Sequence, residues 1–500
     1  MQKRKMGELI KIQKIKGQEG ITLLVLVITI IIIIILATIT MNLALGDGGL
    51  LGQAEDIRDR AENSTKEEAE KRNNLAGELA DLIPFEPQDT PEPEVGGEEF
   101  EMSYGVIEIK WLQGTTNNVS EVPNSPKIKQ ISNGTMELIK FDEENKEWIT
   151  GSDYNYVAGT GTEDNNESRW ANARVTIDGI DSYFVWIPRY AYRIVYFKDE
   201  ASKNEYKNGT ITEEQAIEEG KLVGYSDSRG IVTVEGKRVD SINSASNTTH
   251  TMVSRDYFMP HPAFLDGTEN EFENGEWDEE LEGIWVGKFE NSKTNATSTS
   301  AGNTSIIKVQ PGVKGWRYVD IENMNAYSIA YCEELQSHVL KNSEWGAVAY
   351  LTESAYGRNG TEIEHNGGDF VTGGGAEKAY IELNQAQSTT GNVYGIYDLS
   401  GCSYERMYAY YSEEKSTKYS TTYGYDSNGN TGSNASKYYK YGDATFETSG
   451  WHSDLENFST SWVCRGGNEN TGKEAAGIFN YYYDLGYSAS KAGFRMALAI

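Results

Sequence analysis

Cysteine is scarce in this chain of 500 residues, which has only Cys332, Cys402 and Cys464. Three cysteines so far apart cannot form a disulfide framework, and no CxxC pair indicates a zinc or redox site. One bridge with one free thiol, or three buried thiols, both remain open. Hydrophobic residues make up 38% of the chain, so it can bury one large core or two ordinary ones and is expected to be globular.

Positive charge is also in short supply. The chain has 45 Lys and Arg against 76 Asp and Glu, which gives a formal net charge of −31 and a pI near 4.6. Such a protein repels polyanions, and no basic stripe follows the first 16 residues. The sequence therefore predicts no nucleic-acid partner.

Motifs for metal or nucleophilic chemistry are missing. The five histidines show no HxxxH or HExxH spacing, so no zinc site is predicted. No GxSxG elbow indicates a serine nucleophile, and the glycine runs at 159–164 and 373–378 lack the lysine and the strand-helix context of a phosphate loop. The acid-rich stretch 266–282 could collect calcium, but without DxDxDG spacing a solvated loop is the preferred interpretation.

One long hydrophobic run is present, at residues 21–45, and it carries no charge. As a helix it would measure about 37 Å, enough to cross a hydrocarbon core of about 30 Å. A cleaved secretory signal usually has a shorter apolar region. Because Lys and Arg precede the run and acidic residues follow it, the N-terminus is expected in the cytoplasm. This pattern predicts a single-pass protein of the cell membrane with an extracellular ectodomain.

The segment GQEGITLLVLVITI, at 17–30, resembles the N-terminus of type IV pilin-like (prepilin) proteins, in which a basic leader ends at a glycine before a long apolar helix. The resemblance implies processing after Gly20, Ile21 as the mature first residue, and pilin-like assembly. The family usually has a glutamate five residues after the cut, where this chain has Val25. A plain membrane anchor is therefore the preferred interpretation.

The composition divides the chain into five parts. A basic leader, 1–20, precedes the apolar run at 21–45. Residues 46–83 predict a helical stalk, since apolar residues recur there at three- and four-residue steps among charges. Residues 84–101 are rich in Pro and Glu and predict an extended linker, because proline removes helical hydrogen bonds. The ectodomain follows at 102–500.

Short β-like runs dominate the ectodomain, notably 184–197 and 283–290, which are rich in aromatic and β-branched residues. Helices are predicted at 323–340 and at 343–354, the second with Ser343 as its N-cap. Residues 199–282 look like irregular insertions. The predicted fold class is α+β, with a transmembrane or pilin-like helix and a stalk before a head with long loops.

Five pieces of the head, in order, resemble the formylglycine-generating enzyme (sulfatase-modifying factor) family. They are VWIPRY (185–190), GIWVGKFE (283–290), NSEWGAVAYL (342–351), GNVYGIYDLSG (391–401), and RGG (465–467) with GFRMALA (493–499). The resemblance implies a variant of the C-type lectin fold, with a core at 183–198 and 283–500. It also implies that the final strand returns beside the first.

Some residues of these motifs are expected to build the fold. Glycines permit tight turns and close backbone approach. The arginines are expected to make buried pairs with acids, because a buried unpaired charge is costly. The expected structural set is Arg465, Gly466, Gly467, Gly493, Phe494, Arg495, Asp398 and Glu405.

The resembled enzymes use two cysteines after the RGG motif to bind copper and oxidise a substrate cysteine. Residues 468–500 contain no cysteine, so this chain has no thiolate pair for that chemistry. Cys402 stands where the family motif usually has an asparagine, which also weakens the expectation of the family's structural calcium site. The sequence predicts no catalytic residue, no metal and no cofactor. An active oxidoreductase is the alternative.

Tyr, Ser, Asn and Gly dominate the stretches 407–443 and 479–490, and this is the composition of a recognition surface. Half-buried packing would use the same residue types, and some relatives of this lineage diversify the stretch between RGG and GFR. The expected ligand-binding residues are Trp451, Trp462, Asn468, Asn470, Asn480, Tyr481, Tyr482, Tyr483, Asp484, Tyr487 and Ser488.

Together these patterns predict a surface-displayed, adhesin- or receptor-like binding protein. Its partners would be an extracellular protein or glycan ligand and the membrane, through residues 21–45. A minor pilin-like filament subunit is the remaining alternative.

Overall fold

The computed structural model describes thirteen stretches of this chain. The chain divides into two compact units, Met1–Val95 and Gly96–Ile500, and every described residue belongs to the second. The described residues are 104–159, 167–227, 230–234, 236–241, 244–249, 256–266, 277, 279–374, 384–410, 442–454, 462–472, 475–484 and 486–500. The expected leader, apolar run, stalk and linker, with Gly20 and Ile21, lie outside these ranges.

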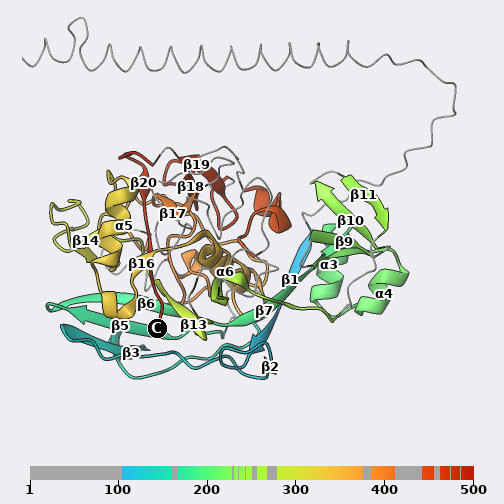
Figure 1. The fold of residues 1–500 in the computed structure, drawn as a ribbon, viewed down its shortest axis with the longest axis horizontal. Helices are drawn as coiled ribbons and strands as arrows, with labels where there is room; N and C mark the ends of the chain where they lie inside the picture. Colours follow the sequence, from blue (N-terminus) through green and yellow to red (C-terminus); the bar gives the residue numbers. More distant parts are fainter. Residues whose placement is uncertain are drawn as a thin grey trace, which may run out of the picture. The chain divides into compact units, whose positions relative to one another are not determined.

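A seven-stranded antiparallel sheet runs along the lower side of Figure 1, in the order β16-β21-β13-β6-β5-β3-β4. Its central strands are rich in Val, Ile, Trp and Phe, residues that suit a pleated surface buried on both faces. The strands are β3 (Gly134–Asp142), β4 (Glu147–Thr150), β5 (Asn172–Ile177), β6 (Ile180–Pro188), β13 (Gly283–Gly287), β16 (His338–Val339) and β21 (Met496–Leu498).

A second antiparallel sheet has the order β11-β10-β9-β8-β7-β1-β2, and a further short strand, β12, pairs with β7. Its strands are β1 (Gly105–Leu112), β2 (Val119–Ser120), β7 (Tyr190–Phe197), β8 (Leu222–Asp227), β9 (Gly230–Thr233), β10 (Lys237–Ser241), β11 (Ser244–Thr249) and β12 (Met259–Pro260). Two short helices, α3 (Glu200–Lys207) and α4 (Glu213–Glu218), lie beside it in Figure 1.

A third, four-stranded sheet has the order β19-β18-β17-β20. It consists of β17 (Tyr404–Tyr410), β18 (Trp462–Arg465), β19 (Tyr481–Asp484) and β20 (Ala492–Gly493). Only the β17–β20 pair is parallel. The remaining elements are the ribbon of β14 (Ser292–Lys293) and β15 (Ile307–Lys308), the helices α5 (Ile321–Ile329) and α6 (Asn342–Glu353), and several single 3-10 turns.

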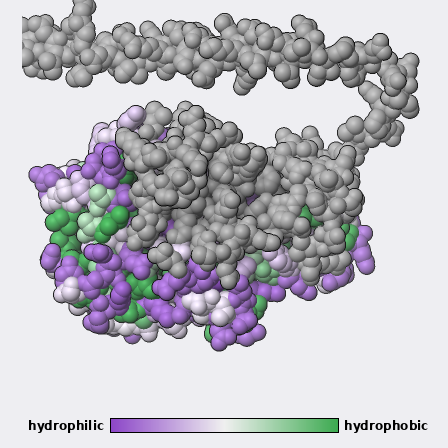
Figure 2. Space-filling model, viewed as in Figure 1, coloured by the Kyte–Doolittle hydropathy of each residue, from purple (hydrophilic) through white to green (hydrophobic). Residues whose placement is uncertain are grey.

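Aromatic rings fill the space between these elements. Trp186 of β6 and Trp285 of β13 are cross-strand partners whose ring centroids lie 5.2 Å apart, and both are fully buried. Every residue of α6 is buried, so this helix is held by packing on all sides and not by one apolar stripe. On the visible described surface in Figure 2, hydrophobic residues lie among hydrophilic ones.

The fold class predicted from the sequence is corrected by this structure. Among the described residues, strands clearly outnumber helices, several sheets are antiparallel, and no helix has the length and apolarity needed to cross a bilayer. The predicted class, an α+β head behind an N-terminal helix and stalk, is therefore replaced by a sheet-rich arrangement of the described residues. The predicted transmembrane helix and cell-membrane localisation are corrected by the same finding and are not carried further.

Several predicted element boundaries also change. The run 184–197 is two strands in two sheets, because the N–H of Arg189 leaves the ladder and donates to the Glu282 carbonyl over 2.9 Å. Helix α5 ends at Ile329, since Cys332 is extended (φ −161°) and Gln336 is left-handed (φ 47°). Lys341, and not Ser343, is the N-cap of α6. Residues 199–249 contain regular helices and strands.

The final strand does not lie directly beside the first of the motif strands. β21, from the GFRMALA motif, pairs with β13, and β13 in turn pairs with β6. The strand order implied by the resemblance is therefore shifted by one position. The reason is that β13, which carries GIWVG, lies between β6 and β21 and pairs with both strands.

Gly346 gives a test of the packing around α6. A Cβ at this position would lie 1.8 Å from the Gly442 carbonyl oxygen. Glycine to alanine in an exposed helix normally stabilises by about 1 kcal/mol, but here we expect Gly346→Ala to destabilise the fold by about 1–3 kcal/mol because the backbone must move. Chemical denaturation measures the change.

The matched control is Gly472→Ala, where a Cβ meets nothing within 4 Å. We expect this variant to unfold at the same denaturant concentration as the wild-type chain. A Gly346→Ala chain as stable as this control would contradict the observed packing.

Candidate functional site

The four-stranded sheet has two faces with different roles. Arg406, Cys464 and Tyr482 are partners across β17, β18 and β19, and Glu405, Arg465 and Tyr481 are the neighbouring set. Because side chains alternate along a strand and partners point the same way, the first set shares one face and the second set shares the other. Tyr404, two residues before Arg406, belongs to the first face.

The first face carries a stacked pair of tyrosines. The rings of Tyr404 and Tyr482 lie 5.5 Å apart at 20°, and both side chains are half-buried. Cys464 and Arg406, on the same face, are buried. The guanidinium of Arg406 pairs with Asp484, with Nε 2.8 Å from Oδ1.

Arg406 also ties together two loops that are distant in sequence. It donates from Nη1 to the Val319 carbonyl over 2.7 Å and from Nη2 to the Tyr487 carbonyl. Backbone bonds add to this tie, from Tyr318 to Ala489 (3.0 Å) and from Ile321 to Gly486 (3.1 Å). The loops 316–320 and 486–490 therefore run side by side.

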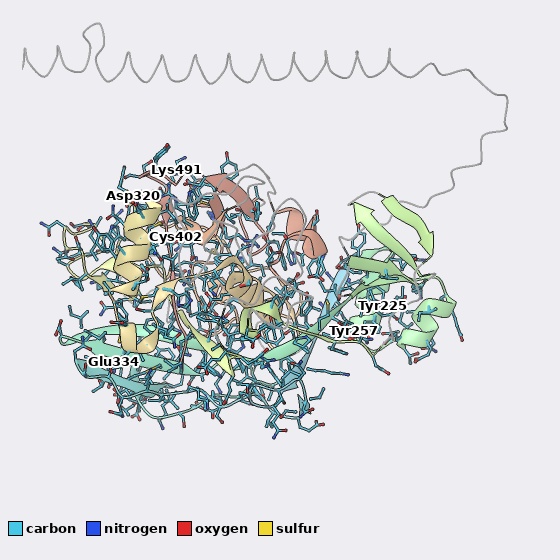
Figure 3. The ribbon with its side chains drawn as sticks, in the orientation of Figure 1. Tyr225, Tyr257, Asp320, Glu334, Cys402 and Lys491 are labelled. Atoms are coloured by element: carbon cyan, nitrogen blue, oxygen red, sulfur yellow. The ribbon has the colours of Figure 1, made fainter. Side chains whose placement is uncertain are left out.

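Each of these loops presents an exposed tyrosine. Tyr318 is 65% exposed and Tyr487 is 70% exposed. Tyr318 has a φ of 58°, a left-handed conformation that costs a bulky residue energy and persists only where surrounding contacts impose it. We call the set of Tyr318, Tyr404, Tyr482 and Tyr487 the tyrosine face. Figure 3 labels Asp320 and Lys491, which flank it in sequence, at the upper left of the molecule.

The sequence-predicted ligand residues divide into two groups. Asn470, Tyr487 and Ser488 are exposed, and Tyr482 and Asp484 are half-buried. The side chain of Tyr483 and most of the stretch 407–443 lie outside the described residues. Buried residues of the predicted set are Trp451, Trp462, Asn468, Asn480 and Tyr481.

The buried members of the set have packing partners. Trp451 meets Phe479 edge to face at 5.3 Å, and the side-chain oxygen of Asn480 accepts from the Gly467 N–H over 3.1 Å. Sequence reasoning missed Tyr318 and Tyr404. No sequence signal could have found them, because only the fold brings 318 and 404 to the stretch after 480.

On the other face of the four-stranded sheet, Glu405 connects the sheet to the core by pairing with Arg495. Its guanidinium pairs with Glu405 (Nε to Oε2, 2.9 Å) and donates to the carbonyls of Gly287 (2.7 Å) and Tyr397 (2.8 Å). All these groups are buried. One of the expected arginine–acid pairs is thus present.

The other expected structural residues have different partners. Asp398 accepts from the Gly373 N–H (2.9 Å) and from Asn366 (2.7 Å). Arg465 donates to the Ala444 carbonyl over 2.6 Å and lies over the rings of Trp345 and Tyr481. Gly466 and Gly467 both have positive φ, and Phe494 is fully buried against Trp316. Gly493 lies next to Ser403 and Glu290.

All three cysteines are free and buried. Burial raises the thiol pKa of Cys332 and, much more strongly, that of Cys402 and Cys464. The neighbouring Glu290 raises the pKa of Cys402 further. The thiolate is the nucleophilic and metal-binding form, and these shifts disfavour it. Of the two arrangements that the sequence left open, the structure has three buried thiols.

A buried carboxyl, that of Glu447, packs against helix α6. Glu447 accepts from the hydroxyls of Tyr192 and Tyr350 and from the Gly442 N–H, each over 2.8 Å. Burial outweighs these hydrogen bonds and raises the pKa of Glu447 to about 7.

Within the described ranges no cluster of three or more His, Cys, Asp or Glu could hold a metal ion. The acid-rich stretch 266–282 lies mostly outside them.

The raised pKa of Glu447 predicts a pH dependence of stability. The folded state holds this proton up to about pH 7, whereas the unfolded chain releases it near the ordinary value of about 4.3. Stability should therefore rise as pH falls from 7 toward 4.5. We expect Glu447→Gln to remove this part of the dependence, measured as the difference in unfolding free energy between variant and wild type at pH 5 and pH 8.

Comparison of Glu447→Gln with the wild-type chain at each pH cancels the contribution that other groups make to the pH dependence of stability. One such group is His261, whose pKa is lowered by burial to about 3. The variant should gain on the wild-type chain at pH 8 and lose that advantage at pH 5. Equal pH profiles for the two chains would contradict the assignment.

Comparison with known proteins assigns no family to this chain. No family model matches it, and no curated protein matches it at a significant level. The family resemblance expected from the motifs therefore remains a proposal, and the tyrosine face is interpreted from its own geometry.

Proposed function

We propose that this chain is a non-catalytic binding protein, an inactive relative of the formylglycine-generating enzymes, and that its tyrosine face contacts a polypeptide ligand. The observation that carries the proposal is the pair of exposed tyrosines, Tyr318 and Tyr487, held on two loops that Arg406 ties together. Fixed aromatic side chains lose little entropy when they bind. Such loops are suited to recognition.

The family part of the proposal is supported by how the motif segments meet. Arg495, from GFRMALA, bonds the Gly287 carbonyl of GIWVGKFE and the Tyr397 carbonyl of GNVYGIYDLSG. Strands β6, β13 and β21, which carry three of the motifs, are neighbours in one sheet. Motifs that are far apart in sequence thus depend on one another in the fold.

The non-catalytic part is supported by the thiols. Cys402 and Cys464 are completely buried, and burial raises both of their pKa values. Oxidation of a substrate cysteine needs an accessible thiolate or a metal held by one. The buried thiols fit a structural role.

A polypeptide is favoured over a glycan because the residues around the tyrosine face match the composition of protein-binding loops. Ser488 and Ser490 are exposed in the same loop as Tyr487, and Asn470 is exposed next to Thr471, whose hydroxyl bonds that of Tyr404 over 3.3 Å. Tyrosine supplies large amphipathic contacts, and serine and asparagine supply adaptable hydrogen bonds. These features are typical of wet, polar protein interfaces.

Selection from a displayed library of short random peptides tests the binding function. We expect the full-length wild-type chain to enrich a family of related peptides, and Tyr318→Ser with Tyr487→Ser to weaken their binding at least tenfold, because hot-spot aromatic residues each contribute about 2 kcal/mol or more. Titration of one selected peptide gives the affinities.

The matched control is Val122→Ser, which removes a side chain that is 66% exposed on another part of the fold. It should bind as the wild-type chain does. Failure to enrich any peptide, or peptides that bind the double tyrosine variant equally well, would refute the proposal. An oligosaccharide array bound in place of peptides would reassign the ligand to a glycan.

Thiol chemistry tests the non-catalytic part separately. We expect no alkylation of the native chain by iodoacetamide at pH 7.5, because burial keeps the three thiols protonated and inaccessible. All three should react after denaturation. Rapid alkylation of Cys402 or Cys464 in the native chain would reopen the oxidoreductase alternative.

A further inference from the structure

Two cationic side chains lie on the loops of the tyrosine face. Arg317 directly precedes Tyr318, and its Nη1 donates to the Ser490 carbonyl over 2.6 Å. Its guanidinium also lies over the ring of Phe370, 3.6 Å from the centroid. Lys491 follows Ser490 and is exposed. One loop thus supplies an arginine, and the residue that directly follows the other loop supplies a lysine.

Three acids of this region have partners within the protein. Asp484 pairs with Arg406 over 2.8 Å, and Asp369 pairs with Lys314. Asp320 caps α5 by accepting from the Asn323 N–H over 2.8 Å. Lys314 chiefly, with a smaller contribution from Arg317, lowers the pKa of Asp369. Among the described residues, neither Arg317 nor Lys491 has a carboxylate within 4.0 Å.

Unpaired cations at one place are unexpected in this chain, which has a net charge of −31. Acidic side chains outnumber basic ones by 76 to 45, so there are more than enough carboxylates to give each basic side chain an ion-pair partner. The bond from Arg317 to the Ser490 carbonyl brings these two cations close to each other along the backbone, and together they provide a local attraction for a negative group against the repulsion of the rest of the protein.

The backbone around Arg317 is strained at three positions. Tyr318, Asp369 and Phe370 have φ values of 58°, 54° and 56°. Gly315 donates to the Phe370 carbonyl over 3.0 Å, which joins the two strained segments. Non-glycine residues in this conformation gather where surrounding contacts impose a geometry that function requires. Here they hold the Phe370 ring under the guanidinium.

We infer that Arg317 and Lys491 form an anion subsite of the tyrosine face, and that it takes a carboxylate of an acidic polypeptide ligand. This inference rests on the proposed function and gives the ligand its chemical class. An arginine held on an aromatic ring presents its N–H groups in a fixed fork that matches a carboxylate. The exposed Lys491 adds a second positive charge on a flexible side chain, which can adjust to the position of the ligand's carboxylate.

The sequences and affinities of peptides selected by the full-length chain test the subsite. We expect the selected peptides to be enriched in Asp and Glu, and their affinity to fall as salt rises. Lys491→Gln should weaken a selected acidic peptide about threefold, in the range of an exposed ion pair. Arg317→Gln should weaken it about tenfold, since charge-assisted bonds are stronger. Arg317→Lys should restore only part of that loss, because lysine has no fork.

Two controls separate binding from folding. Lys198→Gln removes an exposed lysine at the end of the second sheet, just after β7, and should leave affinity and salt dependence unchanged. Thermal unfolding of each variant checks that Arg317→Gln has not destabilised the fold that holds the loop at 316–320. If it has, Lys491→Gln, whose side chain is exposed, carries the test alone.

The outcomes for the subsite and for the binding function differ. Selected peptides without acidic residues, or Lys491→Gln with wild-type affinity and salt dependence, would overturn the anion subsite and leave the tyrosine face standing. Inorganic phosphate that competes much better than acetate would overturn the carboxylate assignment in favour of a phosphate group. Absence of any selected peptide would overturn the binding function itself.

Discussion

The ion pair between Arg495 and Glu405 fixes the strand on which the tyrosine face is built. Both partners are completely buried, and removal of two charges from water costs several kcal/mol for each ion unless their hydrogen bonds are satisfied. The carbonyls of Gly287 and Tyr397 provide that satisfaction for Arg495. Loss of one partner would leave a buried charge uncompensated, so strand β17 is held in one position relative to the core.

Neighbouring residues on β17 then act on opposite sides. Glu405 faces the core, and Arg406, which is also buried, points to the opposite side, where it meets the loops at 316–320 and 486–490. The strand alternation of β17 thus connects a buried charge network to two exposed tyrosines. Tyr318 keeps a costly left-handed backbone in this setting, and a preorganised surface of this kind loses less entropy on binding than a free loop would.

Sequence reasoning reached the parts that depend on local pattern. It placed β13 and the position of α6, and it expected buried arginine–acid pairs without assigning which acid meets which arginine. It failed where a decision depends on tertiary contacts. The aromatic content of Trp462 and Tyr481 suits a surface as well as a core, and only the register of β18 and β19 shows that both are buried. Tyr318 joins the site through backbone bonds to 486–490, which no local signal encodes.

Hydrogen exchange of the chain with and without a selected peptide tests the central claim most directly. The claim is that a ligand binds on the two loops that Arg406 ties together, over a core whose thiols take no part. It predicts that the peptide slows exchange at 316–321 and 486–490 and leaves the amides around Cys402 and Cys332 unchanged. Slowed exchange around Cys402, with no change in either loop, would contradict it.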